Sequence, residues 1–368
     1  MDIVTPPTGL ESSAAIAADI SGRAREKRPM CGWKILAQMA LAATVTGAPL
    51  LAGTARAQDK TYVMKITLPT INESQHLFAK EFAATVEKDS GGRIKAEIYP
   101  ANQLGSIPRQ IEGTQFNAIQ CAIMPPEYLV GVDERFEIMA APGLVDSVEQ
   151  AQRLTADPTA LKMLLGLGAD KGLHGIGLYA IQPSSIISRA PIRHLDDLRG
   201  KKLRIIASPF QSAAFQRLGA APVAMSLGDV LPALQQGTID SALNGMTIYT
   251  SMHYGDAAKF ITEINQPTIF SIIELSKTWY DSLPKDLQQI LDADGAAESK
   301  AIHSRTVQFF EKARSDWAAG GGELISLPPE EQTSMMKTLA SVGDDVSKTK
   351  PQLAEAYKIV TAAAQKVH

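Results

Sequence analysis

The chain has 368 residues, of which 45% are apolar, 20% charged and 6% aromatic, so it holds enough apolar material for two ordinary hydrophobic cores. This composition excludes an intrinsically disordered or collagen-like chain. The 36 Lys and Arg residues nearly balance the 39 Asp and Glu residues, which gives a formal net charge of −3. We therefore expect neither nucleic acid nor an anionic membrane surface as the partner.

The N-terminal segment has the features of a secretory signal peptide. A weakly apolar run over residues 35–52 follows a lysine and precedes the small-residue motif Ala-Arg-Ala at residues 55–57. An anchoring transmembrane helix is the alternative, but polar residues, a glycine and a proline interrupt the run. We predict that residues 1–57 are a signal peptide cleaved after Ala57, with Met30 as an alternative start, and that the mature protein is periplasmic.

The first part of the mature chain alternates strands with helices. Apolar, β-rich patterns predict strands over 62–68, 93–99 and 118–124. Helices are expected from the capping residues 72–74 to the Gly-Gly pair at 91–92, and near 109–113. This order is typical of the doubly wound α/β class, in which helices cover both faces of mostly parallel sheets.

A similar pattern follows after about residue 180 and predicts a second sheet. The expected strands cover 175–181, 185–189, 202–207, 222–225 and 268–275, and the expected helices cover 210–218 and 226–236. Ser226 and Asp229 have the spacing of a capping box at the start of the second helix.

The C-terminal third reads as mostly helical. Residues 284–319 form one helical pattern with Gly295 as its weak point, so we expect either two helices broken at Gly295 or one strut lying along both lobes. A short strand is expected over 323–327. The tail from residue 328 is amphipathic and interrupted by Pro351.

Motifs for catalysis and cofactor binding are missing from the sequence. The six histidines and two cysteines show no metal-ligand spacing, and Cys121 lies in an apolar run typical of a buried small residue. No nucleophile elbow, phosphate-binding loop or dinucleotide-binding fingerprint is present. We therefore expect a binding protein that needs no metal or cofactor and is not an enzyme.

Arg204 is the first candidate for ligand binding. Its strand, Lys-Leu-Arg-Ile, places Leu203 and Ile205 on one face and the guanidinium on the other, near the carboxyl end where open α/β sheets bind ligands. A guanidinium on a largely buried strand needs an anion, and its planar fork matches a carboxylate. A structural salt bridge to an internal Asp or Glu is the alternative, and residue type alone favours it.

Asn244 is the second candidate, because it follows a short predicted strand. Its amide can donate to a carboxylate and accept from a hydroxyl. Taken in isolation, an Asn before Gly245 more often forms a turn.

The sequence around both candidates resembles a known family. Residues 191–245, together with Tyr-Pro-Ala-Asn-Gln-Leu-Gly at 99–105 and Ala-Pro-Gly at 141–143, closely resemble the DctP-type solute-binding proteins of tripartite ATP-independent periplasmic (TRAP) transporters. The resemblance extends from about residue 60 to about residue 330. Several spaced motifs in family order behind a signal peptide make this match more specific than any single string.

The resemblance implies a two-lobed α/β fold of the periplasmic-binding-protein type. Each lobe is then a mostly parallel sheet flanked by helices, and a long helix spans both lobes. We place lobe I at 58–182 plus 270–308. Lobe II is placed at 183–269 plus 309–368 and includes the C-terminal helices. By analogy with the family, the lobes close on the ligand by hinge bending.

The resemblance also assigns the binding residues. The family's carboxylate-binding arginine falls on Arg204 and its ligand-contacting asparagine on Asn244, while Leu227 stands where better-known members have an aromatic wall residue. Some members use a second arginine about twenty residues before the first. This chain has no arginine there, and Arg189 is a weaker candidate because it is slightly out of register.

The remaining contacts are expected from the first lobe and the crossover between lobes. The loops 70–76 and 124–128, which carry Glu73 and Glu127, should close the other side of the site, and Gln182 is a polar contact at the crossover.

Because only one cation is assured, the expected ligand is either a monocarboxylate, for example an aromatic or 2-oxo acid, or a C4-dicarboxylate. The expected protein partners are the membrane permease subunits of a TRAP transporter. An exported sensor module that signals occupancy to a membrane receptor is the alternative.

Overall fold

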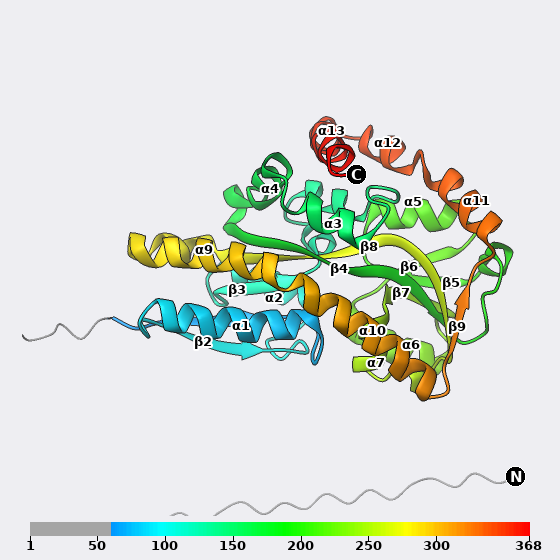
Figure 1. The fold of residues 1–368 in the computed structure, drawn as a ribbon, viewed down its shortest axis with the longest axis horizontal. Helices are drawn as coiled ribbons and strands as arrows, with labels where there is room; N and C mark the ends of the chain where they lie inside the picture. Colours follow the sequence, from blue (N-terminus) through cyan, green and yellow to red (C-terminus); the bar gives the residue numbers. More distant parts are fainter. Residues whose placement is uncertain (1–59) are drawn as a thin grey trace, which may run out of the picture. The chain divides into compact units, whose positions relative to one another are not determined.

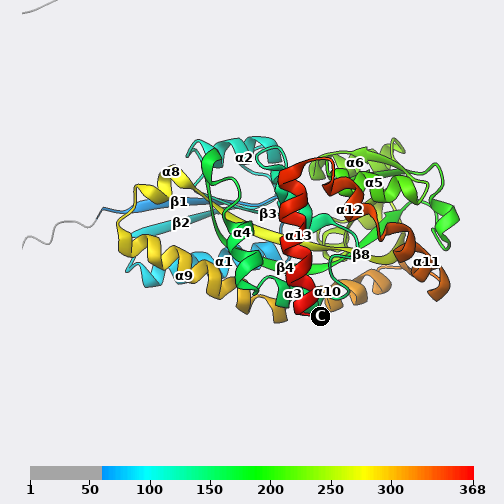
Figure 2. The same ribbon diagram turned by 90° about the horizontal axis from the view of Figure 1, so that it is seen from above.

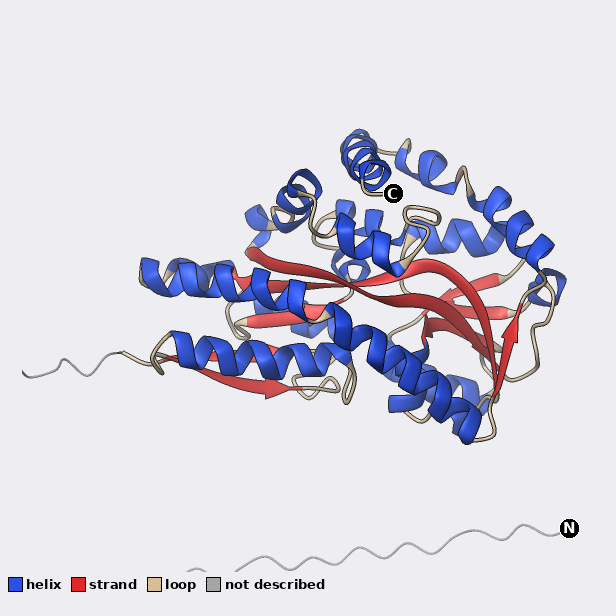
Figure 3. Ribbon diagram, viewed as in Figure 1, coloured by secondary structure: helices blue, strands red, loops and turns tan. Residues whose placement is uncertain are grey.

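The computed structural model describes residues 60–368, so the predicted signal peptide and its cleavage site lie outside the described residues. The described chain is a mixed α/β fold in which helices flank one sheet (Figure 1). Figure 3 shows the strands running between the helical layers. Among the described helices, none combines the length and the apolar character that a membrane span requires.

Nine strands form a single mixed sheet. Its order is β2-β1-β3-β8-β4-β7-β5-β6, and β9 pairs with β8. The strands are β1 (Tyr62–Thr67), β2 (Ile94–Tyr99), β3 (Cys121–Met124), β4 (Leu173–Ser188), β5 (Lys202–Ile205), β6 (Ala221–Ala224), β7 (Ser241–Gly245), β8 (Phe260–Ser276) and β9 (Glu323–Ser326). β1 is parallel to β2 and β3, and β5 is parallel to β6 and β7. The two predicted sheets are therefore the two halves of one sheet.

The long strands β4 and β8 join the two halves. They pair antiparallel over nearly their whole length, with β3 beside β8 at one end and β7 beside β4 at the other. The register shifts between Ala180 and Gln182 and again between Pro183 and Ser185. Such irregularities bend a strand and redirect its side chains. Gln182 therefore lies at the point where the two halves of the sheet meet.

Helices cover the sheet in two groups. They are α1 (Ser74–Asp89), α2 (Ile107–Gln115), α3 (Val148–Leu154), α4 (Pro158–Leu165), α5 (Pro209–Arg217), α6 (Leu227–Gln236), α7 (Met246–Ser251), α8 (Lys277–Asp281), α9 (Lys285–Ala301), α10 (His303–Ala319), α11 (Pro329–Leu339), α12 (Val342–Ser347) and α13 (Pro351–Lys366). Helix α1 packs on β2 and α9, whereas α13 lies against α3, α4 and the 3₁₀ segment η2 (Glu134–Ala140) (Figure 2). The predicted lobe boundaries stay a prediction.

Apolar side chains are buried in three clusters. One lies between α1, α9 and the strands β1, β3 and β8, and contains Cys121, which is fully buried as predicted. A second packs α6, α7 and α10 together with Trp317. The largest runs from α2 through α5 to α13 and so links the beginning, middle and end of the chain.

The long helical segment is broken at a different residue from the one predicted. Helix α9 runs through Gly295 without interruption, and the break falls at Ile302, which ends α9 and begins α10. The prediction of a break at Gly295 was therefore wrong. Helix α9 packs on β4 and α1, while α10 packs on α7 and β9, so that the pair spans both halves of the sheet (Figure 1).

Gly295 is needed for packing. A Cβ atom at this position would lie 2.8 Å from the backbone oxygen of Ile176 in β4, closer than real Cβ contacts come. We expect Gly295→Ala to lower the free energy of unfolding by about 1–2 kcal/mol, because overpacking outweighs the gain in helix propensity of about 1 kcal/mol. Urea unfolding followed by circular dichroism measures the change.

The exposed Ala297 in the same helix provides the matched control for Gly295→Ala. Ala297→Gly should lose about 1 kcal/mol through propensity alone. A Gly295→Ala protein that is more stable than the wild type would contradict the close packing of α9 on β4.

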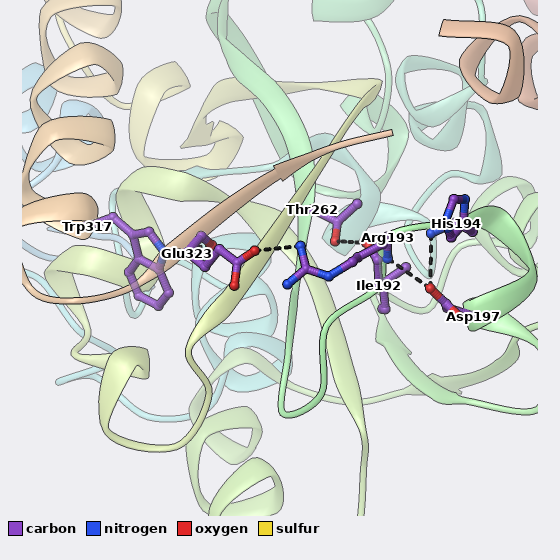
Figure 4. A network of polar contacts seen from close by, with 7 residues as sticks. All are labelled: Ile192, Arg193, His194, Asp197, Thr262, Trp317 and Glu323. Carbon is purple, nitrogen blue, oxygen red and sulfur yellow. Dashed lines mark hydrogen bonds and ion pairs between the residues drawn. The ribbon is translucent and has the colours of Figure 1, made fainter. Parts of the chain in front are cut away.

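A polar network joins the loop after β4 to strands β8 and β9 (Figure 4). Arg193 Nη1 donates to Glu323 Oε1 at 2.6 Å, joining the loop after β4 to β9. Thr262 Oγ1 in β8 donates to the backbone oxygen of Ile192 at 2.7 Å, and Trp317 Nε1 donates to the backbone oxygen of Glu323 at 3.2 Å. This loop leads to β5, so the network anchors the segment that positions Arg204.

Candidate ligand-binding site

A cavity lies where the two halves of the sheet meet. Three parts of the chain form its walls: the loops after β1 and β3, the middle of β4 and β8, and the segments from β5 to α7. The lining residues are Pro69, Thr70, Glu73, Gln75, Pro125, Glu127, Tyr128, Ile181, Gln182, Ser184, Ile206, Gln211, Leu227, Leu243, Asn244, Ile248, Pro267 and Ile269. Apolar side chains with a few polar groups among them are typical of a site for a small organic molecule.

Arg204 lies fully buried directly behind the wall of this cavity. Strand β5 sends Leu203 and Ile205 into the largest apolar cluster and leaves the guanidinium on the opposite face. Its Nε donates to the backbone oxygen of Met225 at 2.9 Å and its Nη1 to that of Leu243 at 3.3 Å. Tyr128 and Leu243, which accept from the guanidinium, both line the cavity.

The charge of Arg204 is not neutralised within residues 60–368. No Asp or Glu in this range forms an ion pair with it, so the alternative of a structural salt bridge finds no support there. Three of the five guanidinium N–H groups have protein acceptors, the third being the Tyr128 hydroxyl at 3.3 Å from Nη2. A desolvated cation in this state favours an anion that accepts two hydrogen bonds.

Asn244 makes a local hydrogen bond to the backbone and also faces the cavity. It is the penultimate residue of β7, opposite Ser185 of β4, and its Oδ1 accepts from the backbone N–H of Gly245 at 2.8 Å. The half-buried amide also lines the cavity. Its Nδ2 makes no hydrogen bond to any described residue, so this donor is available for a ligand carboxylate or hydroxyl.

Gln182 is engaged with the segment that follows β7. Its Nε2 lies 2.5 Å from Thr247 Oγ1, to which it donates, and its Oε1 accepts from the Thr247 backbone N–H at 3.3 Å. A Cβ atom at Gly245 would lie 2.2 Å from Gln182 Nε2, so a larger residue there would displace the Gln182 side chain. Gln182 thus lines the cavity and holds the start of α7 in place.

Leu227 lies in the cavity wall as the first residue of α6, so the wall is aliphatic at this position. The predicted capping box at this helix was wrong. Ser226 is the N-cap residue, but its side chain makes no capping hydrogen bond.

Glu73 lines the opposite wall and caps helix α1. Its carboxylate accepts hydrogen bonds from the hydroxyls of Thr70 and Ser74 and from the backbone N–H groups of Gln75 and His76. Burial raises the pKa of Glu73, although these hydrogen bonds oppose the shift. Its acceptor capacity is used within the protein, so its main role is to shape the wall.

Glu127 also lines the cavity, and one of its carboxylate oxygens has no hydrogen-bond partner among the described residues. It lies in the 3₁₀ segment η1 (Pro126–Leu129), is 4% exposed, and its Oε2 has no hydrogen-bond partner among the described residues. Burial raises the pKa of Glu127 to about 7, and the charge of Glu137 adds to the shift.

Arg189 lies outside the cavity. It follows the last residue of β4, is exposed, and its guanidinium packs against Gly237 at the end of α6. The register of β4 carries it past the site, so Arg189 is not placed to supply a second cation.

Several lining residues were missed by sequence reasoning. Gln211 in α5 has its Oε1 hydrogen-bonded to the backbone N–H of Ile206, and Ser184 lies beside Gln182 in β4. Both are uncharged and belong to no motif. Their only signal is proximity in the chain to Arg204 and Gln182. Across the described residues, no cluster of His, Cys, Asp and Glu is suited to hold a metal ion.

Comparisons with known proteins identify the family. The DctP family model, bacterial extracellular solute-binding protein family 7, matches residues 67–349. Protein YiiZ of Salmonella typhimurium is 30% identical over 209 residues, 56% of this chain and 64% of its own length. The C4-dicarboxylate-binding periplasmic protein DctP of Rhodobacter capsulatus is 26% identical over 274 residues, 73% and 81% of the two chains.

Solved structures show the same fold. The sugar acid binding protein DctPAm of Advenella mimigardefordensis, in complex with galactonate, has a TM-score of 0.79 and 21% identity, covering 84% of this chain and 99% of its own. A TRAP solute-binding protein of Shewanella oneidensis with bound succinate has a TM-score of 0.76 and 20% identity, covering 83% and 99%. The predicted two-lobed fold is therefore confirmed, and the chain belongs to the DctP family of TRAP-type solute-binding proteins, a class of periplasmic receptors.

Proposed function

We propose that this chain is the extracytoplasmic receptor of a TRAP transporter. It binds the carboxylate of a small organic acid between its lobes and delivers the acid to membrane permease subunits for uptake driven by an ion gradient. The observation that carries this proposal is the buried guanidinium of Arg204, which contacts the lining residues Tyr128 and Leu243 from behind the cavity wall and has no carboxylate partner among residues 60–368. The signal peptide, cleaved after Ala57, would deliver the mature protein to the periplasm.

The ligands of related proteins support an organic acid as the substrate class. The structurally similar proteins contain galactonate, succinate and, in a protein of Desulfovibrio salexigens, orotic acid. A relative in Escherichia coli, 26% identical over 220 residues, is a 2,3-diketo-L-gulonate-binding periplasmic protein. These molecules differ in skeleton but share an acid group, for which Arg204 provides the matching charge.

The geometry suggests how the ligand stabilises a closed state. Arg204 and Asn244 bind from the segments that follow the crossover, while η1 contributes Tyr128 and Glu127 from the other wall. A ligand held by one wall gains contacts from the other only when the lobes approach. Its higher affinity for the closed form shifts the population toward that form.

A thermal-shift screen of the mature chain, residues 58–368, against mono- and dicarboxylates tests the binding step. A ligand that binds only the folded state raises Tm by mass action. At a ligand concentration 100 times Kd, the free energy of unfolding should rise by about 2.7 kcal/mol. If no carboxylate raises Tm in the full panel, the proposed binding function is wrong. Uptake of the identified acid by cells with and without this gene then tests delivery. Binding without any effect on uptake would point to the sensor role instead.

A further inference from the structure

The charges of the cavity are unevenly distributed. Glu73 and Glu127 line the cavity, whereas Arg204 supplies positive charge from behind the part of the wall that Tyr128 and Leu243 form. None of the described residues that line the cavity is a Lys, Arg or His. A ligand group that reaches across from Arg204 therefore meets carboxyl groups and no second cation.

Glu127 is the carboxyl group of the cavity that has an unused hydrogen-bond acceptor. Glu73 already accepts hydrogen bonds from four residues of its own loop and helix. In contrast, Glu127 is nearly fully buried, and its Oε2 has no partner among the described residues. A buried acceptor without a partner is costly, and a donor group on the ligand would satisfy it.

Tyr128 links Glu127 to Arg204. Glu127 and Tyr128 are consecutive in η1, and the Tyr128 hydroxyl accepts a hydrogen bond from Arg204 Nη2. Glu127 therefore lines the cavity while Arg204 lies just behind its wall, and the two charged groups form no ion pair with each other. A ligand bound in the cavity lies close to both.

We propose that the site selects an acid with one carboxylate, held by Arg204, and hydroxyl groups that donate to Glu127, and that Glu127 excludes acids with a second carboxylate. This proposal rests on the proposed function and narrows its substrate to hydroxylated monocarboxylates. A hydroxyl donor satisfies the buried carboxylate, whereas a second carboxylate beside it adds like-charge repulsion in a desolvated cavity.

Calorimetric titration of the mature wild-type protein with matched acids tests this selection. The six-carbon series is galactonate, galactarate and hexanoate, and the four-carbon series is threonate, tartrate, butanoate and succinate. Titration at pH 8 keeps Glu127 ionised, since its pKa is about 7. We expect a hydroxylated monocarboxylate to bind most tightly, at least about tenfold more tightly than the dicarboxylate of the same carbon skeleton.

Glu127→Gln isolates the effect of the charge. The variant keeps the size of the side chain and removes its charge, so the preference for the monocarboxylate over its matched dicarboxylate should shrink at least about tenfold. Glu149→Gln on the exposed side of α3 is the control and should leave the preference unchanged. The wild-type preference is informative even if Glu127→Gln fails to fold.

Tightest binding of a dicarboxylate or of an acid without hydroxyls would overturn this inference, as would an unchanged preference in folded Glu127→Gln. In those cases the proposed function survives if the binding of that acid still depends on Arg204. Absence of binding by every hydroxylated monocarboxylate also overturns the inference. Absence of binding by any carboxylate removes the proposed function as well.

Discussion

Replacing Arg204 by alanine is expected to weaken binding of the cognate acid by about two to three orders of magnitude. Removing one partner of a desolvated, hydrogen-bonded charge pair typically costs about 3–5 kcal/mol, because the other charge stays buried without compensation. The guanidinium is fully buried and already oriented by Met225, Leu243 and Tyr128. Little ordering is therefore needed when the ligand binds, and calorimetric titration measures the loss directly.

Two further variants separate the role of Arg204 from a general effect of charge. Arg204→Lys keeps the charge but loses the planar fork, so its affinity should fall between those of the wild type and Arg204→Ala. Arg189→Ala removes an exposed arginine outside the cavity and should bind like the wild type.

Wild-type affinity in folded Arg204→Ala, checked by circular dichroism, would contradict the assignment of Arg204 as the carboxylate anchor. A loss of affinity in Arg189→Ala equal to that in Arg204→Ala would show that net charge, and not the site, controls binding.

The residue pattern predicted the alternation of elements well, for a physical reason. Strands such as β1 and β5 are short apolar runs, and helices such as α1 and α5 follow capping residues, so local periodicity is enough to place them. Arg204 could be identified for the same reason, because a charged residue inside an apolar strand stands out.

The long strands were not predictable from local signals. Gln182, Pro183 and Ser184 interrupt the apolar run of β4, and Asn265, Gln266 and Pro267 interrupt that of β8. Such residues usually mark turns, so each long strand reads as two short ones. Here they mark the irregular centre of the strand pair, where bulges turn polar side chains toward the cavity.

The roles of Gly295 and Glu127 could not be predicted from local sequence either. A glycine in a helical pattern suggests a break, but tertiary contact with Ile176 explains it instead. Glu127, in a Pro-Pro-Glu segment, has the composition of an exposed loop, yet η1 directs it into the cavity. Both depend on contacts between distant segments, which local patterns do not encode.

Glu274→Gln is expected to raise the free energy of unfolding near pH 7, by about 1.4 kcal/mol for each pH unit that separates the unfolded pKa from the folded one. Glu274 lies in β8 opposite Ala122 and Gly175, is fully buried, and neither carboxyl oxygen has a partner among the described residues. Burial raises the pKa of Glu274 well above its ordinary value of 4.5. The folded protein therefore holds this proton to a higher pH than the unfolded chain does, and this difference costs the wild type stability as the pH rises above the unfolded pKa.

The sign of this effect sets its pH dependence. Below pH 4.5 the carboxyl group of Glu274 is protonated in both the folded and the unfolded state, so it causes no loss of stability. As the pH rises, the unfolded chain releases the proton while the folded chain retains it, and the wild type loses stability up to the folded pKa. Glu274→Gln cannot ionise, so the difference between variant and wild type should be small at pH 4 and grow toward pH 7.

Urea unfolding at pH 4, 5, 6 and 7 measures this difference, because contributions of all other titrating groups cancel between variant and wild type. Glu355→Gln replaces an exposed carboxylate in α13 and should show no growing difference. A Glu274→Gln difference that stays constant with pH would mean that water or an unseen partner stabilises the charge. Since Glu274 does not line the cavity, the variant should bind the cognate acid like the wild type, which separates its stability effect from function.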